Sequence, residues 1–167
     1  APLDTPVFES DDIRANTCEE LAALTYRPKI ELDWVPWLHA VRTCEAKRLF
    51  DASTQATGGA LASSALDSTA LDWLPASMAV TLGPMHPPAG KSWKQHQPKF
   101  KTQPHDNTFA VDTHEDHYDV MPLALGDVDH DGNQDAIVMV LYSPRGGSSF
   151  RLDVYVVTRD TTEALGR

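Results

Sequence analysis

The sequence predicts an α+β fold in which two N-terminal helices pack on a small antiparallel sheet. Three observations lead to this prediction. Helical spacing of apolar residues occurs within residues 1–51, apolar runs typical of strands follow residue 120, and an acidic loop joins two of these runs. A chain of 167 residues is long enough to bury a core, and we expect residues 1–167 to form a single domain.

The first helix is expected from about Thr17 to Thr25. Thr17 and Glu20 fit a capping box, in which the hydroxyl and the carboxylate accept hydrogen bonds from backbone amides at the helix start. Pro28 then ends the helical segment, because proline cannot continue a helix.

A second helix is expected from about Pro36 to Phe50. Pro36 suits its first turn, and Trp37 and Cys44 follow at helical spacing. Cys44 and Cys18 are compatible with a disulfide that would join the two helices. The alternative is that both cysteines are buried free thiols.

Residues 52–70 are small and polar, which predicts a flexible connector. Residues 71–167 are expected to be mainly β, with a long loop at residues 83–119. Long surface loops often carry function, so this loop is a candidate binding segment.

Trp93 lies in that loop with Lys91 and Lys94 on either side. No amphipathic pattern surrounds Trp93, so an exposed tryptophan flanked by two lysines would be a partner-binding anchor. The alternative is that Trp93 folds back onto the sheet.

Three strands are expected near the C-terminal end of the chain. Residues 120–125 and 136–142 are apolar runs, and residues 150–156 alternate between apolar and polar side chains. Together they predict an antiparallel meander.

The loop between the first two of these strands carries regularly spaced oxygen donors. Asp127, Asp129 and Asp131 occupy positions 1, 3 and 5, and Gly132 at position 6 permits a sharp turn. Carboxylates packed together without a cation would repel one another, and Ca²⁺ prefers six to eight oxygen ligands. The predicted calcium ligands are Asp127, Asp129, Asp131, Asn133 and Asp135. An acidic, solvated turn without an ion is the alternative.

An EF-hand would place a glutamate at position 12 and a helix on each side, whereas position 12 is Val138 within an apolar run. Over residues 120–158 the chain resembles the FG-GAP and integrin-type calcium-loop repeats, and their single-copy form in secreted bacterial proteins. The resemblance implies that the aspartates of the loop bind calcium. With one copy of the loop, the sequence does not predict a propeller.

The formal net charge is −10, from 14 lysines and arginines against 24 aspartates and glutamates. This charge argues against a nucleic-acid partner, because such binding depends on cationic contacts with phosphates. The charge favours a protein partner of basic character, or no partner.

The cysteine pair, the calcium loop and a start without methionine all favour a periplasmic or secreted protein, although a shortened chain would begin in the same way. No apolar run approaches the length of about 18 residues that a transmembrane helix needs, so no such helix is predicted.

The function favoured by the sequence is therefore a non-enzymatic, calcium-binding, extracytoplasmic binding protein. An inhibitor or immunity protein for a secreted toxin or hydrolase is a specific version. The alternative is a metal-dependent hydrolase in which His105, His114 and His117 hold zinc or nickel beside an activated water. An acidic, solvated loop accounts for the same letters, and no HExxH motif is present.

Overall fold

A computed structural model describes residues 8–10, 13–24, 31–58, 68–79, 90–105 and 108–158. Within these ranges the chain has three α-helices and two antiparallel sheets, which confirms the predicted α+β class. No helix in the described ranges combines the length and the apolar character needed to cross a bilayer.

The N-terminal part contains a hairpin and two helices: β1 (Phe8–Ser10), β2 (Ile13–Ala15), α1 (Cys18–Ala23) and α2 (Glu31–Ala52). Two 3₁₀ helices and a short α-helix follow: η2 (Ser68–Asp72), η3 (Ala76–Met78) and α3 (Trp93–His96). The remaining elements are five strands: β3 (Lys101–His105), β4 (Thr108–Asp112), β5 (Asp116–Gly126), β6 (Asp135–Pro144) and β7 (Arg151–Thr158). These strands pair in chain order, each antiparallel to the next.

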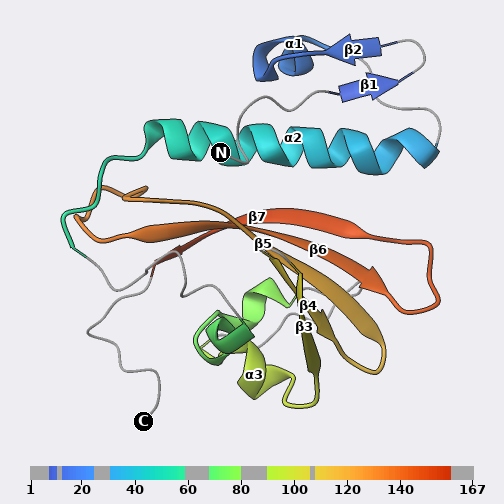
Figure 1. Cartoon of the computed structure of the whole chain (residues 1–167), viewed down its shortest axis with the longest axis vertical. Coiled ribbons are helices and arrows are strands. Elements are labelled where there is room, and N and C mark those ends of the chain that lie inside the picture. The colour runs from blue at the N-terminus through green and yellow to red at the C-terminus, as the bar shows by residue number, and fades with distance from the viewer. Residues whose placement is uncertain are drawn as a thin grey trace.

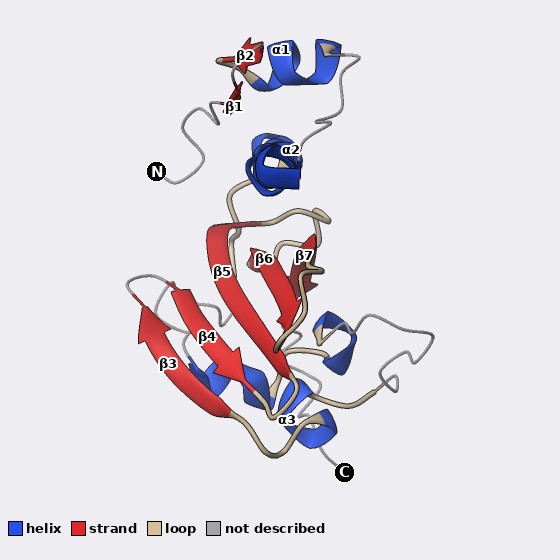
Figure 2. Ribbon diagram, turned by 90° about the vertical axis from the view of Figure 1, so that its right-hand side faces the viewer, coloured by secondary structure: helices blue, strands red, loops and turns tan. Residues whose placement is uncertain are grey.

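The elements are stacked in layers (Figures 1 and 2). The β1–β2 hairpin and α1 lie on one side of α2, and the five-stranded sheet lies on the other side, with α2 contacting β5, β6 and β7. η2, η3 and α3 cover the opposite face of the sheet (Figure 1).

Strand β6 is central to the core because both of its faces are covered. Val138 and Val140 point into the main core cluster with Leu71 and Trp93, whereas Ile137 packs against Ala46 of α2. Alternate residues of a strand point to opposite faces, which explains why residues 136–142 of β6 are apolar without interruption.

The first helix begins as predicted but is shorter. Thr17 is the N-cap, and its Oγ1 accepts a hydrogen bond from the Glu20 backbone amide (3.1 Å). The Glu20 carboxylate accepts from the Asn16 amide (2.7 Å) instead of the Thr17 amide, so the predicted capping box is only half formed.

The second helix begins earlier than predicted, at Glu31, and Pro36 lies inside it. The prediction that Pro36 marks the first turn is therefore wrong. A proline inside a helix removes one backbone hydrogen bond, and this helix tolerates that loss while the neighbouring Trp37 packs edge-on against Phe8 (ring centroids 5.0 Å apart).

A disulfide joins Cys18 of α1 to Cys44 of α2, with their Cα atoms 5.5 Å apart. This confirms the predicted pair. The bridge lies beside a small apolar cluster that connects the N-terminal hairpin and α1 to α2; its buried members are Phe8, Ala15, Leu21 and Ala40. The disulfide therefore links α2 to an N-terminal arm, formed by β1, β2 and α1, that packs on this helix through the small cluster.

Two predicted boundaries differ from the structure. The expected long loop at 83–119 contains α3, β3, β4 and the start of β5, while residues 80–89 and 106–107 lie outside the described residues. Of the expected connector at 52–70, residues 53–58 pair with the β5–β6 loop and residues 68–72 form η2. Residues 59–67 are not described.

Candidate functional site

The acidic loop joins β5 to β6, as the sequence predicted. Gly126 pairs with Asp135 at the end of the ladder, so residues 127–134 form the loop. His130 (φ 63°) and Gly132 (φ 89°) adopt the left-handed conformation. Glycine adopts this conformation without strain, which explains Gly132 at the sharpest part of the turn.

Three carboxylates converge inside the loop. One oxygen each of Asp127, Asp129 and Asp135 lie within 4.8 Å of one another. Oxygens on opposite sides of a calcium ion are about 4.6–5.2 Å apart, twice the usual bond length. These three side chains could therefore hold a single metal ion.

Burial and hydrogen bonding show that Asp135 suits a cation. Its side chain is 0% exposed, and its Oδ2 accepts a hydrogen bond from the Val128 amide (2.8 Å). Its Oδ1 is also buried but has no hydrogen-bond partner among the described residues. A buried carboxylate oxygen without a partner is unfavourable, and a bound cation would remove that penalty.

Backbone amides fix Asp127 in position. Asp127 is 4% exposed, its Oδ1 accepts from the Asp131 amide (3.0 Å), and its Oδ2 accepts from the Gly132 amide (3.0 Å). The turn and the carboxylate thus hold each other, because the loop can donate both amides only in its tightly wound form.

One predicted aspartate ligand, Asp131, is not in the converging group. The Asp131 carboxylate accepts hydrogen bonds from the Asn133 amide (2.7 Å) and from Asn133 Nδ2 (2.9 Å). The structure therefore brings together three of the four predicted aspartate ligands. A calcium ion needs more than three oxygens, so Asp131, backbone carbonyls and water are the further donors at hand.

Residues 53–58, which directly follow α2, run along the acidic loop and form hydrogen bonds with it. We call this segment the strap. Thr54 and Asp127 exchange backbone hydrogen bonds (3.0 and 2.9 Å), and Thr54 Oγ1 donates to Asp127 Oδ2 (3.2 Å). The amides of Thr57 and Gly58 both donate to the Gly132 carbonyl (3.1 and 3.0 Å). Sequence reasoning missed this strap, since its polar residues carry no strand pattern.

Gly126→Ala is expected to loosen the strap. A Cβ atom at Gly126 would lie 2.4 Å from Ser53 Oγ and 3.0 Å from Ser53 Cβ, so the variant should unfold with a free energy lower by about 1–3 kcal/mol. Chemical denaturation measures the loss. Adding Ser53→Gly to the Gly126→Ala variant should restore most of the lost stability. Gly58→Ala, whose added Cβ atom would make only ordinary contacts, should leave stability nearly unchanged. Equal losses in the two alanine variants would contradict the close approach.

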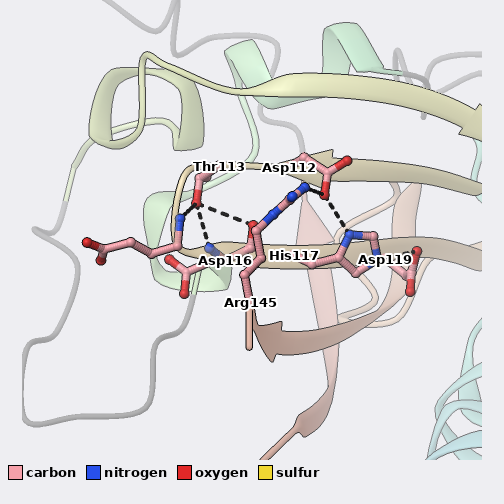
Figure 3. Close-up of polar contacts among 7 residues, drawn as sticks. Asp112, Thr113, Asp116, His117, Asp119 and Arg145 are labelled. Atoms are coloured by element: carbon pink, nitrogen blue, oxygen red, sulfur yellow. Dashed lines mark hydrogen bonds and ion pairs between the residues drawn. The ribbon is translucent and has the colours of Figure 1, made fainter. Parts of the chain in front are cut away.

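A second polar cluster lies at the other end of β5 (Figure 3). His117 Nδ1 lies 2.8 Å from Asp112 Oδ1, and His117 Nε2 lies 3.3 Å from Asp119 Oδ1. The guanidinium of Arg145 donates to the same oxygen of Asp112. Both nitrogens of His117 are thus next to carboxylates.

These neighbours set the protonation of the cluster. Burial by itself lowers the pKa of His117, but the hydrogen bond to Asp112 and the charges of Asp119 and Asp112 outweigh it, so the pKa of His117 is raised. The hydrogen bond with His117, together with Arg145, lowers the pKa of Asp112 against the opposing effect of burial. The folded chain therefore favours a charged His117–Asp112 pair.

The raised pKa of His117 predicts a pH dependence of stability. A histidine with a raised folded pKa stabilises fully below its unfolded pKa of about 6.5 and loses that contribution as pH rises through the folded value. In urea denaturation between about pH 6 and 8.5, His117→Gln should therefore show a smaller decline of unfolding free energy than the wild type. Asp119→Asn should show an intermediate decline. Identical pH profiles for the wild type and both variants would show that His117 is not the source of this pH dependence.

Two of the three histidines proposed for a hydrolase, His114 and His117, belong to no converging group of possible metal ligands among the described residues. His114 is exposed in the turn between β4 and β5, and His117 is held by Asp112 and Asp119. The side chain of His105 lies outside the described residues. Among the residues that the structure describes, Asp127, Asp129 and Asp135 are the one group of three or more possible ligands that converges.

Trp93 is not an exposed anchor, so that prediction is wrong and its alternative is confirmed. The residue is 0% exposed, its ring packs edge-on against Tyr118 (centroids 5.0 Å apart), and its Nε1 donates to Gln97 Oε1 (3.0 Å). Ser92 and Gln95 form a capping box that starts α3, and this Ser-x-x-Gln pattern was the signal available in the sequence.

The two lysines beside Trp93 remain at the surface. Lys94 forms an ion pair with Asp72 (2.6 Å), and Lys91 is exposed. Their role in partner binding stays a prediction.

Comparison with known protein families, with curated proteins and with solved structures found no significant match to this chain.

Proposed function

We propose that this chain is a calcium-binding, non-enzymatic protein of an extracytoplasmic compartment, periplasmic or secreted, and that it binds a protein partner. The observation that carries the proposal is the buried Asp135 oxygen, which has no hydrogen-bond partner among the described residues and lies beside the carboxylates of Asp127 and Asp129. Buried carboxylates without compensation are rare because of their desolvation penalty, and an oxygen-rich loop suits calcium.

The choice of calcium over other divalent ions rests on donor chemistry. The converging side chains are all carboxylates, with no cysteine or histidine among them. Zinc favours nitrogen and sulfur donors, and magnesium demands a rigid octahedral shell and keeps several waters. A loop of alternating aspartates around a glycine accommodates the larger and more variable calcium shell. The resemblance to the FG-GAP calcium loop supports the same ion.

The compartment is inferred from the disulfide together with the metal. Disulfides persist in oxidising compartments and are rare in the cytosol of most cells. The Cys18–Cys44 bridge uses both cysteines of the chain. Weak calcium sites also fill most readily outside the cytoplasm, where calcium reaches millimolar concentration.

Partner binding is inferred from charge. A net charge of −10 accelerates association with a basic surface and disfavours an acidic one. An inhibitor or immunity protein that covers a basic cleft of a toxin or hydrolase is the version that this charge suits best.

Isothermal titration with calcium tests the metal part of the proposal. The wild-type chain is expected to bind one calcium ion, and Asp135→Asn and Asp129→Asn should each lose most of the affinity. Asp129 is exposed, so its variant tests the site even where Asp135→Asn fails to fold. Glu9→Gln on β1 removes one negative charge on the opposite side of α2 from the loop and should bind as the wild type does. Absence of calcium binding at millimolar concentration would contradict the proposal.

The partner is tested separately, by affinity purification from extracytoplasmic extract of the producing cells, in calcium and in EDTA. Recovery of a stoichiometric protein partner is expected. Recovery of the chain alone under both conditions would contradict the partner part and leave the calcium part unaffected.

A further inference from the structure

A hollow of about 410 Å³ lies at the end of the sheet opposite the acidic loop, next to the cluster of Figure 3. It is formed by the segment before and at the start of β3, by the β4–β5 turn, and by the turn after β6. Its lining residues are Lys99, Phe100, Lys101, Asp112, Thr113, His114 and Arg145. We refer to these residues as the basic hollow.

The charge of the basic hollow is opposite to that of the chain as a whole. Lys99 and Lys101 form no ion pair with any residue that the structure describes. The one acidic lining residue, Asp112, is contacted by both Arg145 and His117. Two lysine charges therefore have no counter-charge among the described residues, in a protein with ten more acidic than basic side chains.

Arg145 is held in place at the edge of the hollow. Its backbone amide donates to the Glu115 carbonyl (2.7 Å), and its guanidinium donates to Asp112 through Nη2 (Figure 3). Its side chain is nevertheless 51% exposed. A guanidinium carries five N–H donors in a fixed plane, so the contact with Asp112 orients the group and leaves donors for a second anion.

The hollow also has an apolar part. Phe100 is partly buried and packs against the main core cluster, so its ring is fixed relative to the sheet. Binding pockets for small molecules combine apolar lining with a few polar groups that fix orientation. The basic hollow contains both kinds of group, contributed by three separate segments of the chain.

We propose that the basic hollow binds an organic anion in which a carboxylate or phosphate group is attached to an apolar or aromatic body. Arg145 forms the paired hydrogen bonds to the anionic group, and Lys99 and Lys101 supply the neutralising charge. The ring of Phe100 contacts the apolar body. This site is independent of the calcium loop and of the proposed function.

NMR titration of ¹⁵N-labelled protein in calcium-containing buffer of fixed ionic strength tests the proposal with four probes. Benzoate and phenyl phosphate carry both parts of the ligand, acetate carries the anion alone, and benzyl alcohol carries the ring alone. Benzoate or phenyl phosphate should give saturable shifts at the amides of residues 99–101, 113–114 and 145, and acetate and benzyl alcohol should bind more weakly. The stronger of the first two identifies the preferred anionic group.

Variants separate a built site from general attraction to positive charge. Arg145→Gln should weaken binding of the preferred probe by roughly tenfold, in line with the loss of hydrogen bonds to a charged group. Lys101→Gln, which breaks no described ion pair, should weaken it several-fold. Arg14→Gln makes the same charge change on β2 and should bind as the wild type does. Shifts at residues 127–135 instead, no saturation at any probe, or equal weakening in Arg14→Gln and Arg145→Gln would each overturn the proposal.

Discussion

Calcium is expected to raise the free energy of unfolding by about 4 kcal/mol when its free concentration is about 1,000 times the dissociation constant. For a chain of 167 residues this corresponds to a rise in Tm of roughly 10 °C. The physical reason is that the ion binds only the folded loop, where Asp127, Asp129 and Asp135 converge. One oxygen of Asp135 is buried there with no partner in the part of the chain that the structure describes. Thermal melts in calcium, in EDTA, and in EDTA followed by excess magnesium measure the effect.

Charge variants distinguish a specific site from general screening of the acidic surface. Asp129→Asn should lose most of the calcium-dependent rise, whereas Glu9→Gln on β1 should keep it. Magnesium should give a smaller rise, because it sheds its waters reluctantly and demands an octahedral shell. The same rise in Asp129→Asn as in the wild type would show that calcium acts elsewhere on the chain.

Loss of the Cys18–Cys44 bridge is the second large effect. The bridged residues are 26 positions apart in the sequence. In the chain-entropy treatment, removing a crosslink over a loop of this length destabilises the folded state by roughly 3–4 kcal/mol. The double variant Cys18→Ser/Cys44→Ser should therefore unfold at markedly lower urea concentration than the wild type.

The location of the bridge predicts how the variant unfolds. The arm formed by β1, β2 and α1 contacts α2 through a small apolar cluster, so hydrogen exchange should increase in this arm before it increases in β5 and β6. The stabilisation by calcium should be the same in the variant and the wild type, because the loop and the bridge share no residue. Unchanged urea unfolding in the double variant would contradict a stabilising role for the bridge.

The parts of the structure that the sequence predicted correctly depend on residues close together in the chain. The acidic loop and its flanking strands lie within one continuous stretch of sequence. The apolar run within β6 is typical of a buried strand. The Cys18–Cys44 pair, 26 positions apart, is an exception, and it was predicted because the chain has no other cysteines. Local patterns also indicated the start of α1 at Thr17.

The parts that were missed depend on long-range contacts or on weak patterns. Thr54 contacts Asp127 across 73 positions, and no periodicity in residues 53–58 indicates that pairing. β3 is an edge strand of polar residues, and β4 contributes only Phe109 and Val111 to the core, which is too short an alternation to identify from sequence. The basic hollow combines three distant segments, so only the folded chain assembles it.

The burial of β6 on both faces has a consequence for dissecting this protein. A fragment that begins at Ser53 would keep all five strands of the sheet and the whole acidic loop, and would look like a complete β domain. It would also lose Ala46 and expose the α2-facing side of β6, including Ile137 and the adjoining apolar residues Leu123 and Val154. Exposed apolar patches of this kind promote aggregation. Helix α2 therefore covers one of the two buried faces of β6, and the minimal folding unit of this protein includes this helix.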